Sequence, residues 1–410
     1  MIRKVEIDNY KSLNNLEINL GRLNVLIGEN GCGKSNILEA IGFGGAASAN
    51  QLKKESLVSR GIRVSRPDLM RSGFSKDSIK EEILLKFEIV KDPNELINSN
   101  QIISFRLQNH NQAYSDWFDQ EKDDITKGIR TKLPELIFND KSELLDQIDE
   151  EGQQSIKTLK QVFSLIPKEE VEGIFSNKPF LKFIENFYEK DNYNKLLAEY
   201  RLYSPENSSL RKFEDEEKIQ PLGIKGEGLF KLIKVFTENT DKSTLDTLKK
   251  YLRIIDWFED FNLSASQFEN EKVIELRDRF IKNQIQIQQD NANEGFLFLL
   301  FYLSLFLSED TPRFFAIDNV EASFNPKLCV ELIRIFNELS QSQGKQVLLS
   351  THNPFILDGL DLKDDDQRLF VVRRNREGQT LVKRILPNNG ETKLSEAWML
   401  GYFGGLPKNF

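Results

Sequence analysis

Eight residues near the N-terminus have the types and spacing that hold a phosphate chain. The segment reads G-x-x-x-x-G-K-S and consists of Gly28, Glu29, Asn30, Gly31, Cys32, Gly33, Lys34 and Ser35. In such a loop the glycines turn backbone N–H groups inward, the lysine reaches the β- and γ-phosphates, and the serine hydroxyl binds Mg²⁺. A strand over 22–27 and a helix over 35–43 are predicted on its two sides. We therefore interpret it as a P-loop for ATP and Mg²⁺, with Asn36 also among the binding residues.

A carboxylate suited to the same metal ion follows much later in the chain. Residues 313–318 form an apolar run that ends in Asp318. Such a run predicts a buried strand. A carboxylate at its end would hold Mg²⁺ through water. Asp318 and Ser35 are therefore the predicted metal-binding residues.

Composition limits the class of protein. The 410 residues are 39% hydrophobic and 29% charged, which is typical of a globular protein with two or three domains, or with one core and a large insertion. The longest apolar run, 296–306, is shorter than the roughly 20 residues of a membrane span. The opening residues already read as a strand, and Cys32 and Cys329 offer no disulfide framework. These features predict a cytoplasmic protein that does not enter a membrane.

The expected fold is an α/β P-loop NTPase with a mixed N-terminal sheet, a parallel core sheet and a helical insertion. Strands over 2–7, 16–20 and 82–90 place a first lobe, which contains the P-loop, at residues 1–90. Residues 91–198 are predicted to be a mainly helical insertion without a sustained heptad repeat. A second lobe over 199–410 is predicted to hold strands at 199–203, 346–350, 369–373 and 380–385, with helices at 327–339 and around Trp398.

The opening segment, with Tyr10, Lys11 and Ser12 after its first strand, resembles the N-terminal lobe of the ABC-type ATPase heads of the RecF, SMC and OLD proteins. The resemblance covers roughly residues 1–90 and 199–410, with five motifs in the same order. It implies that Lys11 and Ser12 lie near the nucleotide, although a plain surface turn would have the same composition. It also suggests Gln220 as one candidate for the glutamine that couples the nucleotide to the lid.

The resemblance also implies a composite site between two copies. Residues 291–296 precede an apolar helix at the place of the ABC signature, where relatives carry Ser-x-Gly. Asn293 would replace the serine and Gly295 would keep the close backbone approach. Both would complete the site around Lys34 of a second copy, which predicts an ATP-stabilised homodimer. The alternative is an ordinary helix capped by Asn293.

One departure from the family pattern bears on hydrolysis. Relatives read Asp-Glu-Pro-Glu where this chain reads Asp318, Asn319, Val320 and Glu321. An amide takes no proton, so Asn319 at the position of the catalytic base predicts slow hydrolysis, unless Glu321 takes over as base. Residues 323–326 resemble the D-loop, and His352 occupies the place of the switch histidine that reaches the γ-phosphate.

The resemblance leaves two classes of function open. One is an ATP-gated switch that controls a separate effector, a nuclease, in bacterial defence against phage or foreign DNA. The other is a RecF-like DNA-repair ATPase that acts on DNA directly. A net charge of −8 argues against a chain that coats nucleic acid, but a polar loop with Arg60, Arg63, Arg66 and Arg71 could contact DNA phosphates. The aspartates at 361 and 364–366 share one polar loop, which favours a solvated turn over a metal site.

Overall fold

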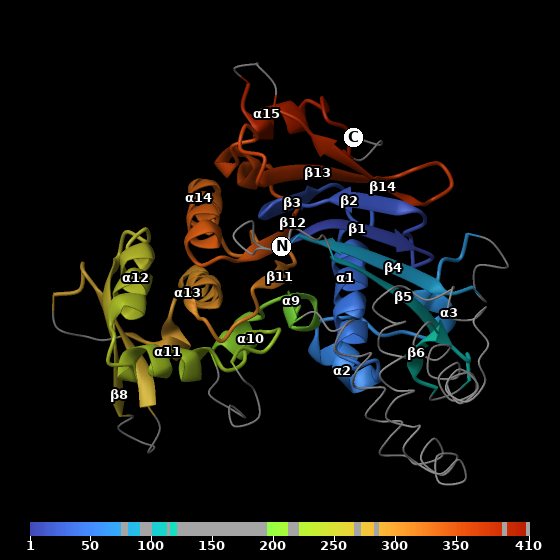
Figure 1. The fold of residues 1–410 in the computed structure, drawn as a ribbon. Coiled ribbons are helices and arrows are strands. Elements are labelled where there is room, and N and C mark those ends of the chain that lie inside the picture. Colours follow the sequence, from blue (N-terminus) through green and yellow to red (C-terminus); the bar gives the residue numbers. More distant parts are fainter. Residues whose placement is uncertain are drawn as a thin grey trace, which may run out of the picture.

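A six-stranded sheet forms the centre of the molecule and carries the P-loop at the end of a middle strand, in a computed structural model (Figure 1). The structure describes residues 1–74, 81–90, 101–112, 115–120, 195–211, 221–265, 272–282, 287–387 and 392–406. In spatial order the strands of this central sheet are β14 (Thr380–Ile385), β13 (Gln367–Arg374), β3 (Leu23–Ile27), β12 (Gln346–Thr351), β11 (Phe314–Ile317) and β7 (Leu202–Tyr203). All neighbours are parallel except β13 and β14.

Alternating side chains of the central sheet enter two different hydrophobic cores. In β3, Leu23, Val25 and Ile27 belong to one core, whereas Leu26 belongs to the other. Strands β11, β12 and β13 divide in the same way. Since successive strand residues point to opposite faces, the sheet is buried on both sides, as its near-continuous apolar runs predict.

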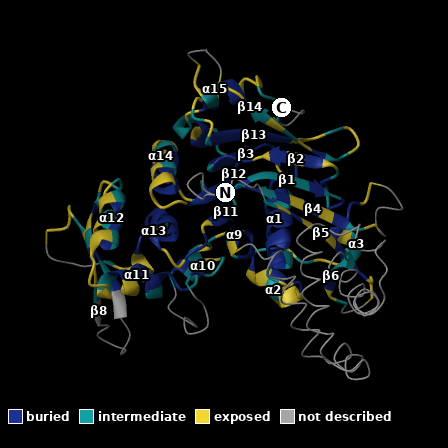
Figure 2. Cartoon of the chain, in the orientation of Figure 1, coloured by how far each residue is buried: buried dark blue, intermediate teal, exposed yellow. Residues whose placement is uncertain are grey.

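Different helices cover these two faces. Helix α1 (Lys34–Ser48), which begins at the P-loop, contributes Ile37, Leu38 and Ile41 to one core. Helices α13 (Glu294–Leu307) and α14 (Pro326–Ser342) belong to the other. Thirteen of the 14 residues of α13 are buried, and the helix is dark blue in Figure 2. The P-loop helix and the helix that follows the predicted signature segment therefore lie on opposite faces of one sheet.

An antiparallel sheet packs over α1 and completes its core. Its spatial order is β2 (Leu16–Asn19), β1 (Ile2–Asp8), β4 (Ile83–Ile89), β5 (Gln101–Asn109) and β6 (Trp117–Asp119). This sheet continues past residue 90, where the sequence predicts the first lobe to end. Within the predicted insertion, the described elements are β5, β6 and the short helix α9 (Lys195–Ala198). The rest of that insertion lies outside the described residues, and the three-domain division stays a prediction.

One buried side chain joins the two large sheets. Gln346, at the start of β12, donates its amide to Ile2 O and Gly21 O, each at 2.7 Å, and accepts from Ile2 N at 2.9 Å. Its exposed fraction is 1%. Buried amides are stable when every donor and acceptor is satisfied. This residue therefore fixes the first strand against the central sheet.

A third, smaller sheet packs with two helices beside α13, at the lower left of Figure 1. Its strands are β10 (Ile287–Gln288), β9 (Lys272–Asp278) and β8 (Phe258–Ala265), and the helices are α11 (Leu229–Glu238) and α12 (Ser243–Leu252). Short helices connect the remaining elements: α2 (Lys54–Ser59), α3 (Pro67–Met70), α10 (Asn207–Leu210), η2 (Gln289–Asn291), η3 (Pro354–Gly359) and α15 (Leu394–Met399).

The fold class predicted from the sequence is confirmed. The strands predicted around the P-loop, the carboxylate at 318 and the histidine at 352 are β3, β11 and β12. Several strands are one or two residues shorter than predicted, and the strand predicted over 199–203 is reduced to the two residues of β7. The helices predicted at 327–339 and around Trp398 are α14 and α15. Within the described part of the chain, no helix combines the length and the apolar character needed to cross a membrane.

Candidate nucleotide site

Two glycines shape the loop between β3 and α1. Gly31 has φ +74° and Gly33 has φ +111°, in the left-handed region that residues with a Cβ seldom occupy. Gly28 is required for a different reason: a Cβ at this position would lie 2.1 Å from Val372 O of β13. The loop therefore needs glycine for both its backbone angles and its close packing.

Lys34 lies across the mouth of this loop. Its Nζ donates to Gly28 O at 2.9 Å and Glu29 O at 3.1 Å, and lies 3.4 Å from His352 Nδ1. Burial lowers the pKa of Lys34. Burial and the nearby Lys34 charge also lower the pKa of His352, so its imidazole is neutral at neutral pH. The structure thus brings the predicted lysine and switch histidine together.

The predicted metal-binding residues also meet. Ser35 Oγ donates to Asp318 Oδ2 at 2.9 Å, and the Ser350 hydroxyl donates to the other oxygen, Oδ1. Hydroxyl and carboxylate oxygens are the ligands that Mg²⁺ prefers. The donor set of Ser35 and Asp318 therefore fits Mg²⁺, and Ser350 orients the carboxylate.

The two residues weighed as catalytic base differ in environment. Asn319 is exposed, its backbone has φ +53°, and its N–H donates to Ser350 Oγ at 3.0 Å. Asparagine tolerates this left-handed conformation better than most residues. Glu321 Oε1 accepts the backbone N–H of His352 at 2.8 Å, while Oε2 is buried without a hydrogen-bond partner. Glu321 thus connects the end of β11 to the switch segment.

Lys11 and Ser12 both bind side chains of the P-loop helix, α1. The Lys11 ammonium pairs with the buried carboxylate of Glu39 in α1. Ser12 Oγ accepts from Asn36 Nδ2 at 2.8 Å and lies 2.7 Å from Thr380 Oγ1. Both residues are therefore anchored to the segment that follows the P-loop. Their roles toward a nucleotide remain predictions.

The arginines predicted to contact DNA divide into two pairs. Arg60 and Arg71 are 2% and 3% exposed and donate mainly to backbone carbonyls, among them Ala198 O and Glu81 O. Their assignment as DNA contacts is wrong, because a buried guanidinium bound within the chain presents no donors to a phosphate backbone. Arg63 and Arg66 are exposed but pair with Glu39 and Asp68. A DNA contact through these two stays a prediction.

Arg63 lies beside the P-loop helix, a position that the charge pattern of the sequence did not indicate. It shares the buried carboxylate of Glu39 with Lys11, and the charge of Asp318 helps to raise its pKa. Two cations on one carboxylate leave an excess positive charge beside the P-loop helix. A signal for this arrangement exists in the sequence only as Glu39, five residues after Lys34 on the same helix.

The predicted signature segment contacts the D-loop. A Cβ at Gly295 would lie 3.0 Å from Ser323 O, and Ser323 Oγ donates to Glu294 Oε1 at 2.5 Å. Asn293 is the N-cap residue of α13, but its side chain accepts no capping hydrogen bond, and the residue is exposed. Asn293 thus occupies the N-cap position of the alternative interpretation without the side-chain bond, and its role as a signature residue stays a prediction.

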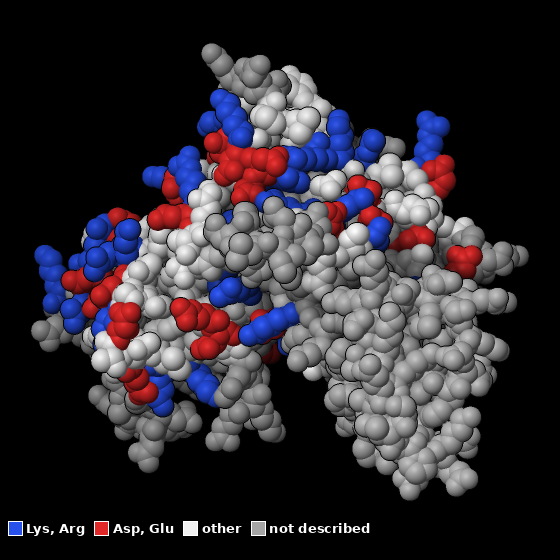
Figure 3. Space-filling model, viewed as in Figure 1, with Lys and Arg blue, Asp and Glu red and all other residues white. Residues whose placement is uncertain are grey.

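Gln220, the candidate coupling glutamine, lies outside the described residues. The acidic loop is described, and two of its aspartates form ion pairs: Asp365 with Arg368 and Arg384, and Asp366 with Arg3. Within the described residues, no group of three or more histidine, cysteine, aspartate or glutamate side chains is placed to hold a metal ion. On the described part of the face in Figure 3, acidic and basic side chains are interspersed.

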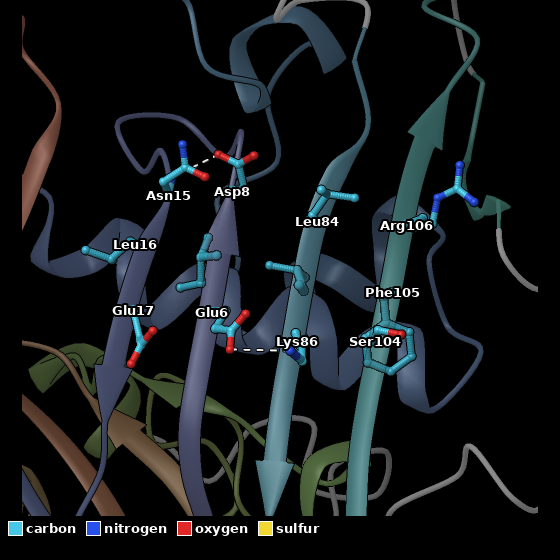
Figure 4. A pocket seen from close by; sticks show the side chains of 12 residues that line it. Glu6, Asp8, Asn15, Leu16, Glu17, Leu84, Lys86, Ser104, Phe105 and Arg106 are labelled. Atoms are coloured by element: carbon cyan, nitrogen blue, oxygen red, sulfur yellow. Dashed lines mark hydrogen bonds and ion pairs between the residues drawn. The ribbon is translucent and has the colours of Figure 1, made fainter.

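A surface hollow of about 450 Å³ lies away from these residues, on the outer face of the first sheet (Figure 4). Its walls include Glu6, Glu17 and Lys86, and Lys86 pairs with Glu6 at 3.5 Å. Asp8 accepts from the backbone of Asn15 at 2.9 Å. Lys4 pairs with both Glu6 and Glu17, and no P-loop residue lines the hollow.

Comparison with known proteins identifies a family and a set of structural neighbours. Residues 1–357 match the family described as "AAA ATPase domain". No curated protein sequence matches significantly. A Smc head domain with an extended coiled coil, bound to the C-terminal domain of ScpA, from Pyrococcus furiosus has 16% identity and a TM-score of 0.49, covering 97% of this chain and 98% of that chain. The SMC head domain from Thermotoga maritima has 11% identity and a TM-score of 0.44, covering 94% and 99%.

Proposed function

Because this chain belongs to the AAA ATPase domain family, we propose that it is an ATPase whose two copies close on ATP and Mg²⁺ bound at each P-loop. Lys34 would reach the phosphates, Ser35 and Asp318 would hold the metal ion, and His352 would sense the γ-phosphate. These side chains already lie within hydrogen-bond reach of one another. Bound Mg²⁺ would neutralise the phosphate charge.

The observation that carries the dimer is the position of the signature segment. Helix α1 and helix α13 pack in different cores on opposite faces of the central sheet. Glu294 and Gly295, at the start of α13, contact Ser323 of the predicted D-loop in the described structure. A nucleotide at Lys34 would therefore meet a signature segment only if a second copy supplied it. Two-fold symmetry would build two identical sites in this way.

We propose further that hydrolysis is slow. Asn319 can hydrogen-bond a water but cannot take its proton, and positioned general bases contribute about 10² to 10⁴ in rate. Glu321 is a poor replacement, since one carboxylate oxygen holds the His352 N–H and the other is buried. ATP would then be bound tightly and hydrolysed at less than about one turnover per second, below the usual range for enzymes.

A long-lived closed dimer suits control of another protein. We propose that this protein is a separate effector, a nuclease, and that the pair acts in bacterial defence against phage or foreign DNA. The support is the slow hydrolysis expected from Asn319, which would set how long the ATP-bound dimer stays closed. The test is to purify the chain with its partner and to compare nuclease activity between the wild type and Lys34→Ala. Equal activity in the two would contradict this proposal.

Sedimentation tests the dimer itself. With ATP and Mg²⁺ at micromolar protein concentration, we expect the wild type to sediment as a dimer and Lys34→Ala as a monomer. Lys86→Ala, on the outer face of the first sheet, is the matched control and should behave as wild type. A wild-type monomer under these conditions, indistinguishable from Lys34→Ala, would refute the proposal.

A further inference from the structure

Thr380, the first residue of β14, joins the last hairpin of the chain to the P-loop. Its side chain is buried, with 1% of the residue exposed. Its hydroxyl donates to Cys32 O at 2.9 Å and lies 2.7 Å from Ser12 Oγ. Its backbone N–H donates to Ser12 O at 2.8 Å. The residue lies beyond positions 1–357, which carry the family match.

The donors and acceptors of this cluster allow one direction of hydrogen bonding. Cys32 O can only accept, so the single proton of the Thr380 hydroxyl is directed to it. Ser12 Oγ must then donate to Thr380 Oγ1, and it accepts in turn from Asn36 Nδ2. Three side chains thus form a chain of bonds that ends on one P-loop carbonyl.

Fixing that carbonyl also fixes an amide. In a planar trans peptide, the C=O of Cys32 and the N–H of Gly33 point in opposite directions. Thr380 holds the carbonyl outward, toward β14, so the Gly33 N–H is directed away from β14. Gly33 accommodates this arrangement, because a Cβ would lie 2.1 Å from Thr380 Oγ1. Backbone N–H groups of a P-loop bind the α- and β-phosphates.

We propose that Thr380 is a positioning residue of the nucleotide site, which aims the Gly33 N–H at the phosphates. The inference rests on the proposed nucleotide binding at the P-loop and extends it to the C-terminal hairpin. It requires no contact between Thr380 and the nucleotide. The effect must therefore appear as binding affinity rather than as the rate of the chemical step.

Thr380→Val removes the hydroxyl and keeps the shape and the backbone bond to Ser12 O. We expect ADP and ATP to bind about tenfold more weakly, by the same factor, because one hydrogen bond is lost and both nucleotides carry α- and β-phosphates. KM should rise while kcat stays within about twofold. Thr380→Ser should restore binding, and Leu381→Ala, an exposed position in the same strand, is the control.

Fluorescence titration with labelled ADP and ATP measures these affinities, and thermal unfolding without nucleotide checks the fold. Ser12→Ala is an independent variant, which should weaken binding less than Thr380→Val because Thr380 can still donate to Cys32 O. Equal affinity of wild type and Thr380→Val, or failure of Thr380→Ser to restore binding, would overturn the inference. A wild type that binds neither nucleotide would instead refute the proposed function, and the inference with it.

Discussion

Two regions of this molecule differ in how far their polar groups are hydrogen-bonded within one chain. They are the P-loop side, around Lys34, and the predicted signature side, around Asn293. On the P-loop side, Lys34, Ser35, Asp318, Glu321 and His352 hydrogen-bond within one chain. On the signature side, Asn293 is exposed and its side chain does not cap its helix. The first side has the groups to hold phosphates and a metal ion, whereas the second offers its polar group to solvent.

Asn293 is exposed although the backbone before it is held by hydrogen bonds. Arg211 donates to Gln289 O at 3.3 Å, Asp290 O at 2.6 Å and Ala292 O at 2.8 Å, so the turn before Asn293 is held in place. Preorganising a loop lowers the cost of binding. A fixed turn that presents an exposed donor is what a composite site between two copies requires.

Lys34→Ala, on the P-loop side, should have the largest effect of these variants on ATP binding. Losing a charged hydrogen bond to the phosphates should weaken ATP binding about 100-fold, from roughly 3 kcal/mol. Fluorescence polarisation with labelled ATP measures the change, with Lys86→Ala as control. Unchanged affinity would remove Lys34 from the site.

Asn319→Glu should sharpen the difference between binding and hydrolysis. A carboxylate at this position should raise steady-state turnover about 100-fold, within the usual contribution of a general base. Asn319→Gln is the matched control, because glutamine is as long as glutamate and must adopt the same left-handed backbone. Its turnover should stay slow. ATP affinity should change little in either variant, since residue 319 is exposed and belongs to neither the P-loop nor the proposed metal-binding pair. A fast wild type that is inactivated by Glu321→Gln would show instead that Glu321 is the base.

Gly295→Ala should disturb the signature side alone. The added methyl would lie 3.0 Å from Ser323 O and 3.2 Å from Asn293 Oδ1, which forces a local shift. Such crowding costs about 1–3 kcal/mol, so ATP-dependent dimerisation should weaken about tenfold. Nucleotide binding by the monomer should be unchanged. Glu309→Ala, beyond the other end of α13, is the control. Weaker nucleotide binding by the Gly295→Ala monomer would contradict the separation of the two sides.

A pH effect is expected at the far end of the signature helix. Lys345 Nζ donates to Leu305 O, Ser308 O and Thr311 Oγ1, while burial and the Arg313 charge lower its pKa to about 7. Between this value and the unfolded pKa of about 10.4, the folded chain binds fewer protons than the unfolded chain. The free energy of unfolding should therefore rise with pH across this window, by at most about 1.4 kcal/mol per pH unit.

Denaturant unfolding at pH 7 to 10 measures this slope. Lys345→Met should lose the contribution, although it should also be less stable at every pH because buried carbonyls lose their donor. Equal slopes in the two proteins would show that Lys345 is not the titrating group.

Sequence predicted the P-loop side well because each of its parts has a local signature. A buried apolar strand followed by a glycine loop, a carboxylate or a histidine can be recognised within a few residues, and β3, β11 and β12 carry these groups as expected. Thr380 has no such signature, since its partner Cys32 is 348 positions away. The chain reversal that joins them depends on the pairing of β13 with β3.

Charge pattern was a weaker guide. Four arginines in one loop predicted a single basic surface, but Arg60 and Arg71 are buried by carbonyl groups from other segments. Composition cannot distinguish a guanidinium that faces solvent from one that binds the backbone. The predicted boundary of the first lobe at residue 90 also missed two strands of the first sheet. β5 pairs with β4 across a break in the sequence pattern, and β6 pairs with β5.

The central claim is that each P-loop is completed by the signature segment of a second copy. Mixing Lys34→Ala with Gly295→Asp tests it, with ATP turnover as the readout, because each variant alone lacks one half of every site. In a two-fold dimer each hybrid has one intact site of its two, so activity should recover on mixing, up to about half of wild type when every dimer is a hybrid. No recovery, in a mixture shown by sedimentation to contain hybrid dimers, would mean that signature and P-loop act within one chain and would contradict the account.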